Sequence, residues 1–249
     1  MTEPCVVVVT GASRGIGLAT ARAFAARGDR VVMAARSDDA LGAAETAIRE
    51  AGGSAWRRVT DVTDPADCDR LVEWTAAHVG EPDVGVLSAG LGHWTPVVDM
   101  SDREWRETMA LNLDGVFYVT RAVLGRMLAR RRGHLVYISS VLGRRGVPNM
   151  AAYSASKAAV AAFGESVAAE AKPAGVKVTV MYPGTAATGM RAHQQRRPQT
   201  PDITDPELQL APEEIAEAIV WVTTLSDRAY PTALTLEPRG TPGGPLEPR

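Results

Sequence analysis

Short apolar runs alternate along this chain with longer Ala-rich stretches that carry helical periodicity. Each apolar run is followed by turn residues, and the seven runs predict strands at 5–10, 30–35, 54–60, 83–88, 133–140, 176–182 and 232–237. The stretches between them predict helices near 15–28, 38–51, 65–79, 102–131, 151–172 and 212–225. This alternation is typical of an α/β protein whose parallel sheet is covered by helices on both faces.

Helix start signals support three of these boundaries. Ser37 precedes two aspartates, Asp64 precedes Pro65, and Ser101 is followed three positions later by Glu104, which is the spacing of a capping box. We therefore expect helices to begin directly after Ser37, Asp64 and Ser101.

The length and composition favour one domain. The 249 residues, 45% of them hydrophobic, suffice for one large core, and no repeat or long linker divides them. We expect a catalytic domain over 1–238 with a substrate loop at about 185–211, whose polar part begins at 191. The Pro- and Gly-rich tail, 239–249, is expected to be disordered or docked on a partner subunit.

The charge pattern and the cysteines exclude several classes of protein. A net charge of −2 gives no basic field for nucleic acid or an anionic membrane. We do not expect Cys5 and Cys68 to form a disulfide framework, and the N-terminus lacks the features of a signal peptide or a membrane span. No Cys/His cluster or HExxH motif indicates a metal site. We expect a cytoplasmic protein.

A glycine-rich turn joins the first strand to the first helix. In "VVVVTGASRGIGLATARAF", Gly11, Gly15 and Gly17 permit a tight turn and close approach of a phosphate to the backbone. The spacing Gly-x-x-x-Gly-x-Gly differs from the usual dinucleotide fingerprint. S-adenosylmethionine enzymes also use glycine-rich first turns, so the turn alone leaves two ligand classes open.

With its neighbouring motifs, the chain resembles the short-chain dehydrogenase/reductase family. The resemblance rests on Thr10 with the three glycines, "DVTD" at 61–64, "SAG" at 88–90, Asn112, the Tyr153–Lys157 pair and "YPGTAAT" at 182–188. It covers nearly the whole chain and implies a Rossmann-like doubly wound sheet, an NAD(P) cofactor, and a dimer or tetramer. The cofactor-binding residues that it implies are Gly11, Ser13, Arg14, Gly15, Ile16, Gly17, Arg36, Asp61, Val62, Ala89, Gly90, Tyr153, Lys157, Pro183, Gly184 and Thr188. Ser88 departs from the family, which commonly has Asn there.

The end of the second strand favours NADP(H) over NAD(H). NAD enzymes usually place a carboxylate there, whereas this strand ends in Ala34, Ala35 and Arg36. Arg36 and Arg14 could together hold the 2′-phosphate. The alternative is that both arginines are solvated and that Asp38 or Asp39 contacts the ribose.

Tyr153 and Lys157 lie four positions apart and share one helix face. Taken alone, such a pair is usually an ordinary surface pair. A fixed ammonium near a phenol lowers its pKa, and the phenol can then exchange a proton with a carbonyl or alcohol oxygen while hydride moves to or from the nicotinamide. The family's catalytic serine corresponds to Ser140, since strand alternation points Ser139 elsewhere. Its helix asparagine corresponds to Asn112, where the family has a local helix irregularity.

The substrate is expected outside the carboxyl ends of the strands, among loops 91–98, 142–150 and 185–210. Trp94, Leu142, Met150 and Met190, with Val147, could line an apolar pocket there. Arg144 and Arg145 could receive a carboxylate or a phosphopantetheine, although a solvated pair is the simpler interpretation. His93 has no identifiable partner.

These features predict an NADP(H)-dependent oxidoreductase that interconverts a ketone or aldehyde and an alcohol. A 3-oxoacyl carrier-protein reductase is a close alternative, because "TGASRGIG" and the length are similar to those enzymes. A cofactor-sensing regulator without turnover is the alternative from another class. We expect a small-molecule substrate, no nucleic-acid or membrane partner, and a homo-oligomer.

Overall fold

Seven parallel strands form a single sheet. A computed structural model describes residues 4–190, 208–226 and 228–239. Every neighbouring pair of strands is parallel, in the order β3-β2-β1-β4-β5-β6-β7. The strands are β1 (Val6–Thr10), β2 (Arg30–Ala35), β3 (Ser54–Val59), β4 (Val84–Leu87), β5 (Gly133–Ile138), β6 (Val176–Pro183) and β7 (Ala233–Leu236). The predicted doubly wound, seven-stranded α/β fold is confirmed.

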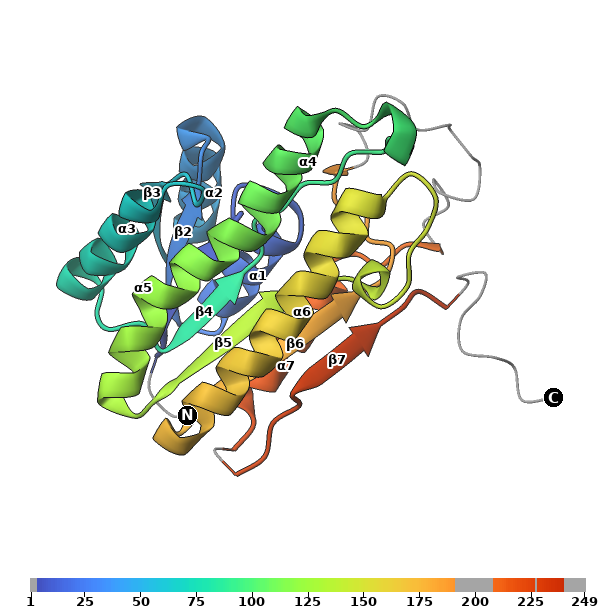
Figure 1. Ribbon diagram of the computed structural model, residues 1–249. Coiled ribbons are helices and arrows are strands. Elements are labelled where there is room, and N and C mark those ends of the chain that lie inside the picture. The colour runs from blue at the N-terminus through green and yellow to red at the C-terminus, as the bar shows by residue number, and fades with distance from the viewer. Residues whose placement is uncertain (1–3, 191–207, 227, 240–249) are drawn as a thin grey trace.

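Helices cover both faces of this sheet (Figure 1). One face carries α1 (Gly15–Ala26), α2 (Asp38–Glu50) and α7 (Pro212–Thr224), and the other carries α3 (Pro65–His78), α4 (Asp102–Met109), α5 (Gly115–Arg130) and α6 (Ala151–Ala171). Short 3-10 turns lie at η1 (Val97–Asp99), η3 (Val141–Gly143) and η4 (Lys172–Ala174). Among the described residues, no helix is both long and apolar enough to span a membrane.

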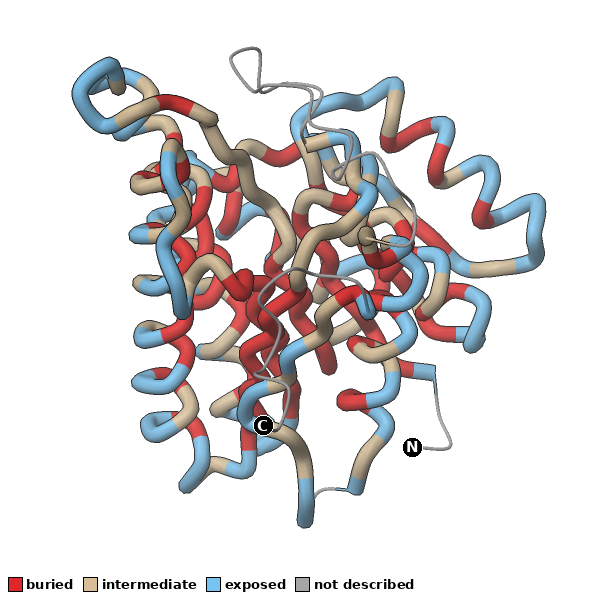
Figure 2. Tube along the Cα trace, turned by 90° about the vertical axis from the view of Figure 1, so that its right-hand side faces the viewer, coloured by how far each residue is buried: buried red, intermediate tan, exposed pale blue. Residues whose placement is uncertain are grey.

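Side chains alternate across the sheet and fill a core on each face. Val7 and Val9 of β1 pack with Phe24 of α1, whereas Val6 and Val8 pack with Leu71 of α3. A strand buried on both faces needs apolar residues at consecutive positions, which explains why β1 reads as an unbroken run of valines. Figure 2 shows the resulting concentration of buried residues in the strands and on the inner sides of the helices.

The three predicted helix starts are confirmed by their caps. Ser37 Oγ accepts a hydrogen bond from Ala40 N at 3.3 Å, and Asp64 Oδ1 accepts one from Ala66 N at 2.9 Å. Ser101 and Glu104 form the complete capping box, in which each side chain bonds the other's backbone N–H. These bonds, first among them that from Ser101 N, lower the pKa of Glu104 to about 2.

The helix expected over 102–131 contains one irregular turn. α4 and α5 are joined by η2 (Ala110–Asp114), a turn of π-helix that includes Asn112. The sequence pattern predicts a continuous helix, and the resemblance alone implies an irregularity at this position. Turns of π-helix are often found at functional sites, because the extra residue redirects the side chains around it.

The strand order places a crevice at the carboxyl ends of β1 and β4. The chain runs outward from β1 to β3, returns to β4 beside β1, and continues outward to β7. Ligands of doubly wound sheets bind at this point of reversal. The expected loop segment 191–207 and the tail residues 240–249 lie outside the described residues.

Candidate active site

A cavity of about 830 Å³ opens at the carboxyl ends of the strands. It brings together residues from the glycine-rich turn, the ends of β2 to β6, and the start of α6. The predicted residues that line it are Gly11, Ser13, Arg14, Gly15, Ile16, Gly17, Arg36, Asp61, Val62, Ala89, Gly90, Trp94, Ser140, Leu142, Met150, Tyr153, Lys157, Pro183, Gly184, Thr188 and Met190. Asn112 and His93 are not among the lining residues.

The glycine-rich turn is packed too tightly for side chains at Gly11 and Gly17. Gly11 has φ +66°, and a Cβ there would lie 2.8 Å from the backbone of Ala89. A Cβ on Gly17 would overlap the carbonyl oxygen of Gly11. The turn is therefore held against the β4 end on one side and folded onto itself on the other, which directs the N-terminus of α1 toward the cavity.

The turn after β4 is tied to the end of β1. Thr10 Oγ1 accepts hydrogen bonds from Ser88 N at 3.2 Å and Ala89 N at 3.3 Å. The contact uses the backbone of residue 88, so serine in place of the family's usual asparagine leaves it intact. This side-chain contact fixes the spacing between the two strands that border the crevice.

Two arginines and no aspartate border the cavity at the end of β2. Arg14 and Arg36 line it together with Ser37, whereas Asp38 and Asp39 are not among the described lining residues. Asp38 Oδ1 instead lies 3.1 Å from Arg57 Nε on β3. Of the two aspartates that could have contacted an NAD ribose, Asp38 is thus engaged away from the cavity, and Asp39 does not line it.

Asp61 and Val62 form the wall beyond the end of β3. Asp61 Oδ1 accepts from Thr63 N at 3.0 Å and from Thr63 Oγ1 at 2.8 Å, which holds this turn in one conformation. Val62 is buried, and a Cβ on Gly115 of α5 would lie 2.9 Å from one of its methyl groups. Local hydrogen bonds and close packing therefore support the wall at the position expected for an adenine ring.

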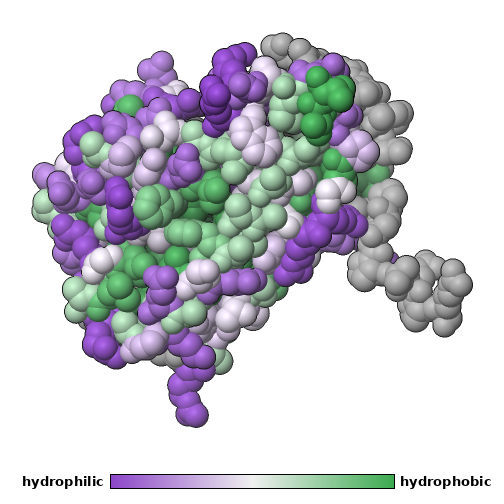
Figure 3. All heavy atoms as spheres, viewed as in Figure 1, coloured by the Kyte–Doolittle hydropathy of each residue, from purple (hydrophilic) through white to green (hydrophobic). Residues whose placement is uncertain are grey.

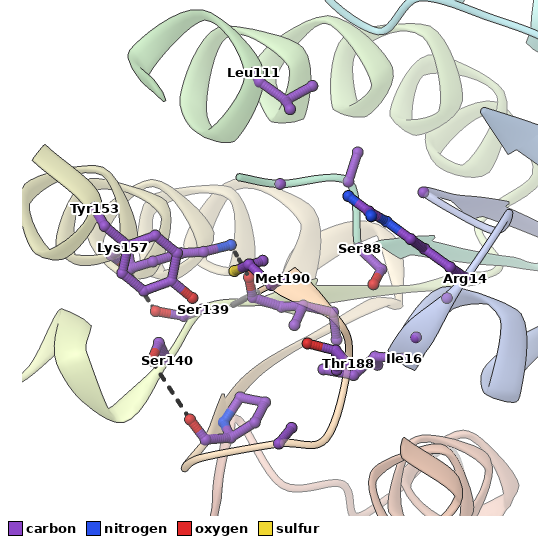
Figure 4. A pocket seen from close by; sticks show the side chains of 18 of the residues that line it. Arg14, Ile16, Ser88, Leu111, Ser139, Ser140, Tyr153, Lys157, Thr188 and Met190 are labelled. Carbon is purple, nitrogen blue, oxygen red and sulfur yellow. Dashed lines mark hydrogen bonds between the residues drawn. The ribbon is translucent and has the colours of Figure 1, made fainter. Parts of the chain in front are cut away.

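Ser140, Tyr153 and Lys157 converge at the other end of the cavity (Figure 4). The Ser140 hydroxyl forms a hydrogen bond with the Tyr153 side chain. Lys157 Nζ lies 5.7 Å from the centre of the Tyr153 ring and donates to Ile138 O at 2.8 Å. Ser139 also borders the cavity, but its hydroxyl donates to Lys157 O at 2.7 Å and is thereby turned toward α6.

The expected lowering of the Tyr153 pKa is not found. Desolvation by the surrounding protein raises the pKa of this phenol, although its ring keeps some exposure to the cavity, and the hydrogen bond with Ser140 opposes the rise. Burial also lowers the pKa of Lys157 to about 8, so the ammonium form predominates at neutral pH but is lost at a lower pH than in a free lysine. The phenol is consequently protonated at neutral pH.

Asn112 connects three elements next to this group. Its Oδ1 accepts from Leu91 N at 2.8 Å, and its Nδ2 donates to Leu91 O at 2.8 Å and to Ser156 Oγ at 2.9 Å. A Cβ on Gly90 would lie 3.2 Å from Asn112 Oδ1 and 3.4 Å from Lys157 Nζ. The π-helical turn thus places the asparagine amide close to the lysine and locks the loop after β4.

The substrate end contains one charged residue, Glu237, that the sequence analysis did not nominate. Glu237, directly after β7, lines the cavity, as does Arg145. Arg144 and Arg145, expected to be solvated or to receive an anion, both contact the end of β7, through Thr235 and Glu237 respectively. Glu237 could have been found by applying the strand-end rule to the last strand as well as to β4, β5 and β6.

His93 does have a neighbour, although the sequence offered none. Its Nε2 lies 3.5 Å from Glu107 Oε2 on α4, outside the cavity lining. Within the described ranges, no group of three or more His, Cys, Asp or Glu residues could hold a metal ion.

Comparison with known proteins agrees with this geometry. A model of the family described as short chain dehydrogenase matches residues 5–199. The chain belongs to the short-chain dehydrogenase/reductase family. It is an oxidoreductase of the kind that acts on alcohol and carbonyl groups, similar to 3-oxoacyl-[acyl-carrier-protein] reductases.

Similarity to named members extends over almost the full length. The chain is 34% identical over 241 residues to the 3-oxoacyl-[acyl-carrier-protein] reductase of Escherichia coli, covering 96% of this chain and 97% of that protein. It is 38% identical over 237 residues to the corresponding reductase of Synechocystis, covering 94% and 95%. The solved structure of an actinorhodin polyketide ketoreductase variant with NADPH matches with a TM-score of 0.88 and 31% identity, covering 96% of this chain and 97% of that chain.

Proposed function

We propose that the protein reduces a ketone or aldehyde to an alcohol with NADPH, and catalyses the reverse reaction with NADP⁺. The observation that carries this proposal is the convergence of Ser140, Tyr153 and Lys157 on the same cavity as the glycine-rich turn. A dinucleotide bound along the strand ends would place its phosphates at the turn and its nicotinamide beside Tyr153.

The residues present fit such a cofactor. The N-terminus of α1 would face the phosphates, Arg14 and Arg36 would supply two cations for a 2′-phosphate, and Asp61 and Val62 would border the adenine. Pro183 ends β6 and Gly184 and Thr188 follow it, and these residues would lie over the nicotinamide half. When bound, the cofactor supplies the hydride. The NADPH-bound polyketide ketoreductase among the similar structures supports NADP(H) over NAD(H).

Tyr153 is assigned the proton transfer. A phenol that is protonated at neutral pH can donate to the carbonyl oxygen as the hydride adds to its carbon, and it is restored by proton uptake. Ser140, bonded to the same phenol, would donate a second hydrogen bond to that oxygen. Lys157 would hold the nicotinamide ribose, while Asn112 keeps the loop after β4 and the neighbouring Ser156 in place.

The names of the similar reductases favour a second candidate within the same chemistry. Two relatives that match over nearly their full length are 3-oxoacyl-[acyl-carrier-protein] reductases. The corresponding substrate would be a 3-oxoacyl thioester. The alternative from another class, a cofactor sensor without turnover, is disfavoured by the Ser140–Tyr153–Lys157 group.

An NADPH oxidation assay tests the proposal. We expect steady loss of NADPH absorbance with at least one member of a panel of ketones, aldehydes and a 3-oxoacyl thioester, at about 1 s⁻¹ or faster. Preference for the thioester would support the second candidate. Tight NADPH binding without turnover of any member would contradict the enzyme and favour the sensor.

We also propose that the protein is a homo-oligomer joined through α5 and α6. These helices lie side by side on one face, where apolar residues gather (Figure 3). Phe117 is 41% exposed and packs edge-on against Phe163 of α6, with their ring centres 6.2 Å apart. An exposed aromatic on such a face is typical of a covered surface.

Light scattering of the full chain measures this assembly. We expect a mass of two or four chains, each of 26.4 kDa, and a smaller mass for Phe117→Lys. A wild-type mass of one chain at micromolar concentration would contradict the proposal.

A further inference from the structure

An ion pair stands at the substrate end of the cavity. Arg145 Nη2 lies 3.6 Å from Glu237 Oε1, and both residues line the cavity. The arginine side chain is 44% exposed and the glutamate side chain 22% exposed, so the carboxylate is the more enclosed of the two. Arg145 belongs to the loop between η3 and α6, and Glu237 follows β7.

The loop that carries Arg145 is anchored to the same strand by its neighbour. The Arg144 guanidinium lies 3.7 Å above the centre of the Tyr182 ring and donates to Thr235 Oγ1 at 3.0 Å. The end of β6 is joined to β7 as well, since Gly184 N donates to Leu236 O at 2.7 Å. The segments that carry Arg145 and Glu237 are therefore joined to each other by these contacts, which hold the two residues close together.

Apolar side chains also line this end, beside Ser140 and Tyr153. These include Trp94, Leu142, Val147 and Met150. Arg14, Arg36 and Asp61 line the opposite end, where β1, β2 and β3 finish, and Lys157 lies beside Tyr153. Among the described lining residues, Arg145 and Glu237 are the remaining charged groups, and their charges cancel.

The Arg145–Glu237 pair affects a carboxylate group of a substrate and an uncharged group differently. In a partly enclosed cavity, charges interact more strongly than in bulk water. An anionic substrate group near the pair would be repelled by the enclosed Glu237, while the attraction of Arg145 is already directed toward that glutamate. A neutral ester, thioester or alkyl group is not repelled by Glu237.

We propose that Glu237, with Arg145, determines the charge selectivity of the substrate end, so that uncharged carbonyl compounds are reduced in preference to their carboxylate analogues. The inference rests on the proposed reductase function. It identifies the class of substrate by charge and assigns a specificity role to the residue that directly follows the last strand.

The ethyl ester and the free acid of one 3-oxo carboxylic acid test the inference. The measured quantity is the ratio of kcat/KM for the ester to kcat/KM for the acid. We expect Glu237→Gln to lower this ratio about tenfold or more by improving reduction of the acid, and Arg145→Gln to raise it. An unchanged ratio in Glu237→Gln would overturn the inference.

Charge-conserving variants and a double variant distinguish an effect of charge from a general disruption of the site. Glu237→Asp and Arg145→Lys keep the charges and should keep a ratio close to that of the wild type. The double variant, Arg145→Gln with Glu237→Gln, should give an ester-to-acid ratio between those of the two single variants. If the role were structural, both substrates would lose kcat/KM equally and the ratio would stay constant, which also overturns the inference.

Failure of the proposed function gives a different result. If the wild-type protein binds NADPH but reduces neither the ester nor any other carbonyl compound, the reductase itself is overturned, and this inference with it. If the wild type is active and Glu237→Gln leaves the ratio unchanged, the charge selectivity alone is overturned. Melting temperatures of all variants confirm that the folded protein is compared.

Discussion

Replacing Tyr153 with phenylalanine should lower kcat for carbonyl reduction by about 10²- to 10⁴-fold, the usual contribution of a positioned acid or base. The substitution removes the hydroxyl that is bonded to Ser140 and leaves the ring in place. A Cβ on Gly92 would lie 2.9 Å from the ring, so the ring is packed against the loop after β4. NADPH affinity should therefore change little.

Steady-state kinetics and a fluorescence titration with NADPH measure kcat and the NADPH affinity separately. The matched control is Tyr118→Phe, which removes a phenol from α5 outside the cavity lining and should retain wild-type kcat. If Tyr153→Phe kept kcat within threefold of the wild type, another group would be the proton donor.

Replacing Arg36 with aspartate should reverse the preference between the two nicotinamide cofactors. The substitution removes a cation from the cavity wall at the end of β2 and adds a carboxylate that repels the 2′-phosphate but can bond the ribose hydroxyls of NAD(H). We expect the ratio of the dissociation constants for NADPH and NADH to rise about a hundredfold, chiefly through weaker NADPH binding.

The same titration with both cofactors measures this shift. Arg22→Asp is the matched control, because it makes the same change of charge on an exposed position of α1 outside the cavity lining. Equal changes in the two variants would indicate a general electrostatic effect, and an unaltered ratio in Arg36→Asp would contradict the NADP(H) assignment.

The fold could be predicted from the sequence because local and global signals agree. The valine run of β1 is buried on both faces, and Ser37, Asp64 and Ser101 cap their helices as their side chains suggest. The π-helical turn at 110–114 gives no comparable signal, since its residues are as compatible with a regular helix as those around them.

Features that depend on burial or on distant segments were not predictable in this way. Strand alternation and motif order indicated Ser140, Tyr153 and Lys157, which do meet in the cavity. The predicted lowering of the Tyr153 pKa was wrong, because a sequence does not show how far desolvation of the phenol outweighs the effect of a neighbouring cation. The contact between Arg145 and Glu237 joins positions 92 residues apart (237 − 145), and nothing local to either position indicates it.

The π-helical turn gives the long helix a constraint on length as well as on composition. Each residue of an α-helix rotates the chain by about 100°, so removing one residue from 110–114 would turn α4 by that angle relative to α5. Asn112 would then point away from Leu91 and Ser156 even with its identity preserved. Substitutions that keep the number of residues here are therefore compatible with the site, whereas a single insertion or deletion is not.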